Sequence, residues 1–364
     1  MTHTAATQPR PTALHVPDWR KSNPYQALLG SALEAQGVRV RWSGLPQGLF
    51  PLNRLGRALE GVRIIHLHWS NDIVGAVVWD TNPIKRWLRL ALLVADVGLI
   101  RLRGLRIVWT IHNLVTHESG DRTAEISARR LLGWSCNQVI LHSDSALKRV
   151  EHNYGLRLQH KAHVIPHGNY VGIYPPNPTR MRTLMDECGI EADSIVLLFF
   201  GAIRAYKRVP QLVKTFCRTQ NPKLRLVIAG NANPPELAQE IEAAAADDSR
   251  VRFRRGFVPD EDVAAYYDLA NAVLIPLEQS LTSGSIVLAM TMCKATILHD
   301  EGRVFDLVTS QSGVFYRSEA ELIDVLDTIK RTDLIRMGSA AASSVANQDW
   351  PTVAKATKRA YGLK

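Results

Sequence analysis

Short apolar runs recur along the whole chain and alternate with segments in which apolar residues repeat every three or four positions. One such segment places Val209, Leu212, Val213 and Phe216 on one face of a helix. Apolar runs that end in Gly, Pro, Asn or charged residues are typical of buried parallel strands. The pattern therefore predicts an α/β protein built on parallel sheets. Strands are expected at residues 12–17, 38–42, 63–69, from 106, 137–144, 161–170, 194–201, 224–233, 251–253, 272–276, 294–300 and 313–316.

A proline cluster divides this pattern into two halves. Residues 174–180, YPPNPTR, hold three prolines, which predicts a stiff linker between domains. A chain of 364 residues is long enough for two cores. We expect two doubly wound, Rossmann-like domains that face a cleft. Their predicted bounds are residues 1–172 for the N-terminal domain, 173–180 for the linker, 181–349 for the C-terminal domain and 350–364 for a last helix packing back on the first domain.

The composition and net charge favour some classes of function and one cellular compartment over others. The net charge of +10 favours an anionic partner, such as nucleic acid, a phosphorylated substrate or an acidic membrane, although it also serves solubility. Nucleic-acid binding is disfavoured because the basic residues are spread along the chain and aromatic residues make up only 7%. None of the four cysteines lies in a C-x-x-C pair, so neither a zinc site nor a disulfide framework is indicated. With no apolar leader and no spanning segment in the sequence, we expect a cytoplasmic protein.

Residues 84–106 form an apolar segment with basic ends. Such a helix fits the surface of an anionic membrane, on the inner face of the cell membrane in this case. The alternative is an ordinary helix that packs on the sheet and leaves a solvated basic edge. Both interpretations are open at this stage.

Polar side chains gather where the strands of the first half end. His66 and His68 lie on the same face of a strand, and Asp72 follows that strand. The two imidazoles could bind a metal ion, but we favour hydrogen bonding in the core. The next strand leads to His112 and Glu118. So many acid–base groups at a strand end favour a site, although Glu118 also suits a helix cap.

The second half offers a place for a diphosphate. Arg204 and Lys207 follow its first strand, and a carboxylate, Glu278, precedes a turn of small residues that opens a helix. Free backbone amides and the positive end of the helix dipole suit a phosphate there. The turn consists of Thr282, Ser283, Gly284 and Ser285. The alternative is that Ser283 only caps the helix.

These motifs resemble those of the GT-B glycosyltransferases of the broad family 4-like group. VIPHG at residues 164–168 is similar to that group's V-I-P-N-G, and residues 199–210 are similar to its G-R…K-G segment. The resemblance implies that Arg204 and Lys207 hold the donor diphosphate and that Glu278 takes the place of the first Glu in the next motif. Leu288 stands where a second Glu normally holds the ribose.

A closer resemblance is to bacterial β-mannosyltransferases of the xanthan type. It is carried by Ser283-Gly284-Ser285, which substitutes for the missing Glu, and by residues 22–25, 66–69 and 109–118. The resemblance implies acceptor contacts at Asn23, Tyr25, His68 and Asp72. It also implies that His112 contacts the donor sugar, and that the backbone around Phe257 and Val258 holds the donor base.

The implied activity is transfer of a sugar from a nucleotide diphosphate donor to a lipid-linked or oligosaccharide acceptor, and we expect inversion at the sugar. GDP-mannose is the favoured donor and a UDP-sugar the other. We expect no metal and no cofactor, because no D-x-D pair lies in a suitable loop. His112 and Glu118 are the first candidates for the general base, and Asp144 and Asp72 the next.

Two other functions share this architecture. A non-catalytic nucleotide-sugar-binding module would fit the loss of a ligand at Leu288, and a sugar-nucleotide epimerase would use the same two domains. Donor hydrolysis would separate an enzyme from a binding module, and product analysis would separate a transferase from an epimerase.

Overall fold

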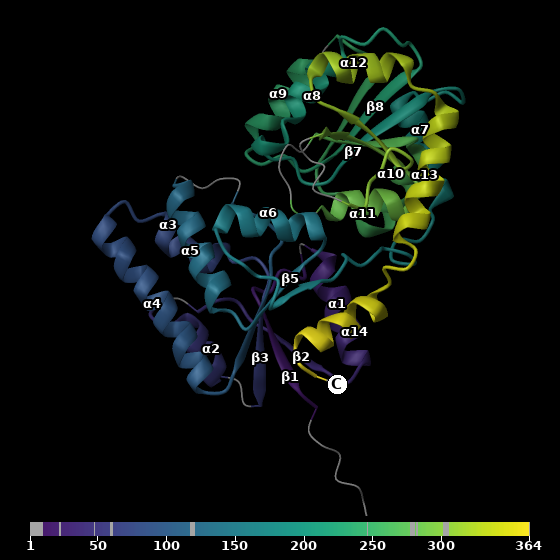
Figure 1. The fold of residues 1–364 in the computed structure, drawn as a ribbon. Helices are drawn as coiled ribbons and strands as arrows, with labels where there is room; N and C mark the ends of the chain where they lie inside the picture. The colour runs from purple at the N-terminus through teal and green to yellow at the C-terminus, as the bar shows by residue number, and fades with distance from the viewer. Residues whose placement is uncertain are drawn as a thin grey trace, which may run out of the picture. The chain divides into compact units, whose positions relative to one another are not determined.

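The protein consists of two compact units, each with one parallel sheet. The computed structural model describes residues 10–21, 23–46, 48–58, 61–116, 121–245, 247–276, 281, 283–300 and 306–363. The first unit comprises Met1–Gly168 and Trp350–Lys364, and the second comprises Asn169–Asp349. Each contains a six-stranded sheet with flanking helices (Figure 1). The predicted fold class, α/β with two doubly wound domains, is confirmed.

The first sheet has the strand order β2-β1-β3-β4-β5-β6, and all its pairs are parallel. Its inner strands are buried on both faces, which explains why they appear in the sequence as unbroken apolar runs. The chain direction across the sheet reverses between β1 and β3, and ligands of open α/β sheets bind at such a point. The strands are β1 (Thr12–Val16), β2 (Arg39–Trp42), β3 (Val62–Leu67), β4 (Arg106–Thr110), β5 (Gln138–Leu141) and β6 (Ala162–Val164).

Helices cover both faces of the first sheet. On one side α14, the last helix of the chain, packs against α1 (Figure 1). Trp350, Val353 and Tyr361 from this last segment belong to the same core cluster as Tyr25 and Leu29 of α1. The helices of this unit are α1 (Pro24–Ala35), α2 (Pro51–Ala58), α3 (Asn71–Val78), α4 (Pro83–Leu102), α5 (Arg122–Ser135), α6 (Asp144–Tyr154) and α14 (Trp350–Ala360).

The second sheet has the order β12-β11-β10-β7-β8-β9, which is the Rossmann order read from the opposite edge. Its reversal point lies between β7 and β10, which pair in parallel. Its strands are β7 (Ile195–Phe200), β8 (Leu224–Gly230), β9 (Val251–Arg255), β10 (Ala272–Ile275), β11 (Ala295–His299) and β12 (Gly313–Tyr316).

Helices flank the second sheet, and one face of that sheet carries an apolar core that includes Leu197, Leu226 and Ile297. The first of them, α7, begins at Pro178, inside the segment that we predicted as a linker. They are α7 (Pro178–Cys188), the 3-10 turn η1 (Ala205–Lys207), α8 (Val209–Phe216), α9 (Glu236–Ala245), α10 (Asp260–Leu269), α11 (Gly284–Thr291), α12 (Glu319–Thr328) and α13 (Arg331–Val345).

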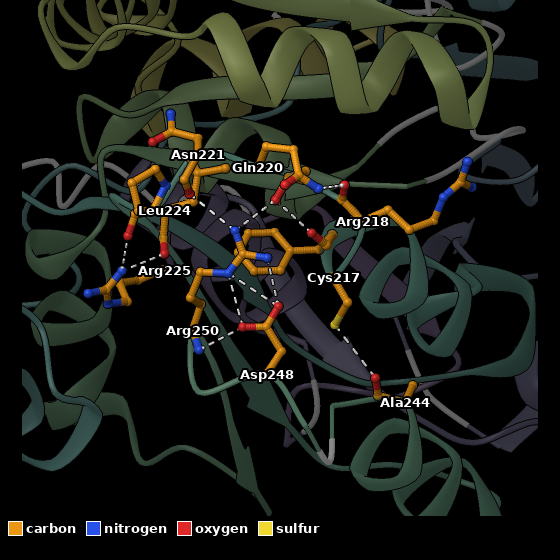
Figure 2. Close-up of polar contacts among 12 residues, drawn as sticks. Cys217, Arg218, Gln220, Asn221, Leu224, Arg225, Ala244, Asp248 and Arg250 are labelled. Carbon is orange, nitrogen blue, oxygen red and sulfur yellow. Dashed lines mark hydrogen bonds and ion pairs between the residues drawn. The ribbon is translucent and has the colours of Figure 1, made fainter.

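Arg250, just before β9, connects neighbouring segments at the amino-terminal edge of the second sheet through hydrogen bonds and an ion pair (Figure 2). Its guanidinium pairs with the Asp248 carboxylate at 2.7 Å, and Nη1 donates to Thr219 Oγ1 at 3.2 Å and to the Asn221 carbonyl at 3.1 Å. These bonds fix the segment between α8 and β8 against β9. The opposite, carboxyl-terminal edge is where a parallel sheet of this kind binds ligands.

None of the helices in the described part of the chain is both long enough and apolar enough to cross a bilayer. The longest, α4, has 20 residues, and Asp96 lies on its buried side. The Asp96 carboxylate accepts hydrogen bonds from the amides of Leu52 and Asn53, both at 2.8 Å. It thereby satisfies two donors at the start of α2.

Candidate functional site

Six histidines lie at the carboxyl-terminal edge of the first sheet. They come from β1 and from the residues at or just after the ends of β3, β4, β5 and β6, so they gather around the reversal point between β1 and β3. Five are buried and His142 is partly buried; the six are His15, His66, His68, His112, His142 and His167. The sequence pattern identified His66, His68 and His112 as candidates. It did not identify His15, His142 and His167 as site candidates, because only the sheet topology brings these strand ends together.

Four of these histidines form one continuous line of hydrogen bonds. Thr110 Oγ1 lies 2.7 Å from His66 Nε2, and His66 Nδ1 lies 2.7 Å from the Tyr361 hydroxyl. That hydroxyl lies 3.0 Å from His15 Nε2. His15 Nδ1 lies 3.0 Å from His68 Nε2, and His68 Nδ1 lies 3.4 Å from His112 Nε2. We call these six residues, from Thr110 to His112, the histidine network.

Aromatic rings enclose the outer end of the histidine network. The Trp69 ring stacks on His112 with centroids 4.5 Å apart, and the edge of Tyr25 approaches the same imidazole at 5.0 Å. Tyr25 also lies 4.9 Å from the ring of His167. The predicted acceptor residue Tyr25 is therefore brought next to His112. Asn23 caps α1, because its side chain accepts a hydrogen bond from the Tyr25 amide at 3.0 Å.

Burial keeps these imidazoles neutral at ordinary pH. It lowers the pKa of His15 and of His167 to about 3 and that of His142 to about 4. Burial, followed by the neighbouring histidines, holds the pKa values of His66, His68 and His112 well below their usual range. A neutral imidazole presents one donor and one acceptor.

The ring of His142 has a fixed tautomer. Its Nδ1 lies 2.8 Å from the carbonyl of Ile165, and because a carbonyl only accepts, Nδ1 carries the proton. Its Nε2 is then a bare acceptor, and this buried atom has no partner among the described residues. A buried acceptor of this kind is suited to a hydroxyl group of a ligand or a water molecule.

Three of the histidines have the composition of a metal site. Ring nitrogens of His15, His66 and His68 lie within 4.8 Å of one another. Every ring nitrogen of this trio, however, already has a hydrogen-bond partner in the histidine network. The arrangement is therefore the hydrogen-bonded alternative that the H-x-H spacing favoured, and a metal ion would have to replace several of these bonds.

The carboxylates predicted for this half lie at helix starts. Asp144 is the first residue of α6 and is exposed, and Ser143 rather than Asp144 caps that helix. Asp72 lies in the first turn of α3, where partial burial of its carboxyl raises its pKa. Glu118 lies outside the described residues. The cap of the following helix, α5, is Asp121, whose carboxylate accepts from the Ala124 amide at 2.9 Å.

A buried ion pair braces the loop that carries His112. Arg129 and Glu125 of α5 pair at 2.7 Å and are almost fully buried. Arg129 donates to Ser70 Oγ at 2.9 Å, and the Glu125 carboxylate accepts from the Thr116 amide at 2.6 Å. The pair thus connects the loops that follow β3 and β4. In the sequence, only the i, i+4 spacing of Glu125 and Arg129 indicates this pair.

Two cations follow β7 in the second unit. Arg204 precedes the turn η1 and Lys207 ends it. The Lys207 ammonium donates to the Ala202 carbonyl at 2.6 Å. Burial, and then the positive charge of Arg204, lowers the pKa of Lys207 to about 8. Both cations lie in the short segment that follows β7, where they can attract an anion together.

The neighbouring strand, β10, leads into α11. Ser283 occupies the cap position of α11, but its side chain makes no capping hydrogen bond. The interpretation that Ser283 only caps the helix therefore lacks the hydrogen bond on which it depends. The amides of Gly284 and Ser285 have no partner among the described residues. Such amides at a helix start attract an anion. Glu278 and Thr282 lie outside the described residues.

Phe257 and Val258 follow β9 and line a hollow of about 300 Å³. Arg180 and Tyr266 line it as well. Phe257 is 80% exposed although its side chain is apolar.

Comparisons with known proteins show which sequences and structures this chain is similar to. Residues 194–330 match the family described as Glycosyl transferases group 1. Over 98% of its length the chain is 25% identical to a GDP-mannose:glycolipid 4-beta-D-mannosyltransferase of Xanthomonas campestris pv. campestris, and the match covers 93% of that protein.

Solved structures show the same fold. The HepE protein of Anabaena in complex with UDP and glucose has a TM-score of 0.73 and 16% identity, and covers 96% of this chain and 99% of its own. Sucrose-phosphate synthase of Thermosynechococcus elongatus has a TM-score of 0.77 and 16% identity, with 97% and 98% covered. At this identity the likeness concerns the fold, which is that of the GT-B class.

Proposed function

We propose that this chain, a glycosyltransferase of the GT-B fold with a group 1 domain, transfers mannose from GDP-mannose to a glycolipid acceptor, with inversion at the sugar. The observation that carries the proposal is the reversal point of the second sheet. There Arg204 and Lys207 follow β7, and the open amides of α11 follow the paired strand β10. The choice of mannose and GDP rests on the Xanthomonas relative, which is similar along nearly its whole length.

The second unit would hold the donor. Arg204, Lys207 and the amides of Gly284 and Ser285 would neutralise the diphosphate as it leaves, which is the role that fixed donors and cations play in transition-state stabilisation. No divalent ion is then needed for that charge. Glu278, Thr282 and Ser283 would contact the donor from the same loop, and the hollow at Phe257 and Val258 would take the base.

The first unit would hold the acceptor and the general base. Its neutral imidazoles offer single donors and acceptors, which suit sugar hydroxyls better than they suit a charged group. Tyr25 and Trp69 enclose His112 with flat apolar surfaces. The base that takes the acceptor proton would be His112, Glu118, Asp144 or Asp72.

We further propose that α4 rests on an anionic membrane that carries the acceptor. One side of α4 packs inside the unit through Leu90, Leu93, Val97 and Ile100. The opposite side is also apolar but exposed, and this exposed apolar stripe consists of Ile84, Trp87, Leu88, Ala91, Ala95, Leu99 and Leu102. A helix of this length presents a stripe of about 30 Å, which is far more than scattered surface residues.

Basic residues accompany the stripe. Lys85 and Arg89 lie beside its first turns and Arg101 near its end, so the charge suits acidic headgroups. Arg103 and Arg106 have other roles: Arg103 donates to Asn53 Oδ1 at 3.0 Å and Arg106 to the Tyr361 carbonyl at 3.2 Å.

The direct test combines donor binding with transfer. Thermal shifts with GDP, UDP and ADP should be largest with GDP, and the protein should release GDP from GDP-mannose when glycolipid vesicles are added. Arg204→Ala should weaken GDP binding at least tenfold, because it removes a charged contact. Arg225→Ala, at the amino-terminal edge of the same sheet, is the matched control. Unchanged GDP affinity in Arg204→Ala would show that the phosphate assignment is wrong, and a preference for UDP would refute GDP-mannose as donor.

A further inference from the structure

The histidine network can carry its protons in only two arrangements when all its imidazoles are neutral. The four inner members link two neighbours each, and a neutral imidazole there must donate to one side and accept from the other. The Tyr361 hydroxyl does the same, because it is buried and an O–H that accepted from both His66 and His15 would leave its own proton without a partner among the described residues. The direction of one bond therefore sets the direction of all. Either every bond is donated from Thr110 towards His112, or every bond is donated from His112 towards Thr110.

The buried end of the network decides between the two arrangements. Thr110 is fully buried, and His66 is the partner of its hydroxyl among the described residues. If His66 donated to Thr110, the Thr110 O–H would be left without an acceptor inside the protein, which is costly. If Thr110 donates instead, every buried donor has a partner. The one unpaired N–H is then at the other end, on His112.

His112 is also the member through which the network reaches the surface. Its side chain is 6% exposed, whereas His15, His66 and Thr110 have no exposed area. Its Nε2 faces His68, so Nδ1 is the free nitrogen, and it has no partner among the described residues. An unpaired donor is tolerated there because a ligand or water can accept from it.

We propose that Tyr361, His15, His66 and His68 are positioning residues that hold His112 as a neutral imidazole with its proton on Nδ1, so that His112 donates a hydrogen bond to an oxygen of the bound sugar and is not the general base. Proton removal from the acceptor hydroxyl then falls to a carboxylate. Glu118, Asp144 and Asp72 are the candidates in this chain. The identity of the sugar rests on the proposed function, but the tautomers do not.

Depressed basicity agrees with this arrangement. Burial and the neighbouring imidazoles of His142 and His167 hold the pKa of His112 well below its usual range, so it is a poor proton acceptor near neutral pH. The groups facing it are Tyr25 from α1, His68 and Trp69 after β3, and His142 after β5. None of these is a carboxylate that would raise its pKa.

The tautomers can be read directly by nitrogen NMR on protein labelled with 15N-histidine at pH 7.5. We expect His15, His66, His68 and His112 to carry the proton on Nδ1, with signals assigned by single substitutions. Tyr361→Phe removes the donor to His15 Nε2, so His15, His68 and His112 should shift towards the Nε2–H form. Thr110→Val removes the donor that sets the direction and should shift all four.

Tyr154→Phe is the matched control for the loss of a buried hydroxyl. Tyr154 lies in the same unit and is as buried as Tyr361, but its hydroxyl donates to the Leu114 carbonyl outside the network. It should leave the four tautomers unchanged. A wild-type His112 with its proton on Nε2 would overturn the inference, and so would tautomers that stay unchanged in both Thr110→Val and Tyr361→Phe. Stoichiometric zinc bound by His15, His66 and His68 would overturn it too.

Activity gives a second, separate readout. The side-chain amide nitrogen of Asn lies as many bonds from Cβ as His Nδ1 does, so it can take the place of Nδ1. The side-chain amide nitrogen of Gln can take the place of Nε2 for the same reason. His112→Asn should keep at least tenfold more kcat/KM for GDP release from GDP-mannose than His112→Gln. The reverse order would overturn the donor role. If wild-type protein released no GDP, the proposed function would fail, while the NMR result would still decide the tautomers.

Discussion

Lys207 has a charge that depends on pH in the range where proteins are assayed. Its ammonium is held by the Ala202 carbonyl, and burial together with Arg204 lowers its pKa to about 8. Arg204 stays charged at any such pH. If both cations bind the diphosphate, the site in the free protein loses one of its two charges as the pH rises through about 8.

GDP affinity should therefore fall on the alkaline side. The charged form of Lys207 binds, so affinity is highest below pH 8, and the Kd for GDP should rise about tenfold between pH 7 and pH 9 because about one lysine in ten is still charged at pH 9. Calorimetric titrations across this range would measure it. Lys207→Arg keeps a charge at every pH and should give a flat profile. A wild-type profile that is equally flat would place Lys207 outside the diphosphate site.

At the scale of a single element, α4 has two apolar sides, one buried and one exposed. The inner side is explained by packing, and Asp96 is explained by its bonds to the start of α2. The exposed apolar stripe is not explained by any packing within the described residues. Burying an exposed Trp or Leu is worth about 1.5–3 kcal/mol, so a few such side chains suffice for reversible membrane binding.

The double substitution Trp87→Glu with Leu88→Glu should lower binding to vesicles that contain acidic lipid by at least tenfold. It removes two large side chains from the apolar stripe and adds two negative charges that the headgroups repel. Cosedimentation with vesicles would measure the loss. Ile335→Glu in α13 is the control, since Ile335 is an exposed apolar residue of the second unit. Equal binding of all three proteins would remove α4 as the membrane contact.

At the scale of the whole molecule, the two units differ in their response to acid. The first unit holds six neutral histidines, five of them buried and His142 partly buried, whereas His299 is the one histidine of the sequence between residues 169 and 349. The pKa values of the six are lowered in the folded state, to about 3 for His15 and His167. Unfolded chain binds protons below pH 6.5, so each of these histidines favours unfolding as the pH falls from there towards the folded pKa.

We expect the first unit to unfold before the second between pH 6.5 and 5. His15, His142 and His167 each cost about 1.4 kcal/mol of stability at pH 5.5, which for the three amounts to roughly 4 kcal/mol, a large part of the stability of many domains. Hydrogen exchange followed by mass spectrometry would report on each unit separately. Loss of protection in both units at the same pH, or in neither above pH 5, would contradict this estimate.

Much of the fold followed from the sequence because it depends on local patterns. Buried parallel strands need unbroken apolar runs, and those runs fell on β1 to β12 within about three residues of their ends, except that β6 ends at Val164 instead of residue 170. Helix α8 followed from its apolar spacing. The proline cluster marked the passage between units only roughly, because Pro178 begins α7 and prolines are favoured at the first turn of a helix.

The amino-acid sequence by itself determined the two α/β halves, the basic and small residues after β7 and β10, and the histidines at the strand ends, since each depends on residues close together in the chain. Only the tertiary structure decided that β1 and β3 are neighbours and that Tyr361, just after α14, reaches the histidines of the first sheet. Tyr361 therefore links His15 to His66 across about 300 residues of sequence. Strand order and helix docking arise from packing between distant segments, and no local pattern records them.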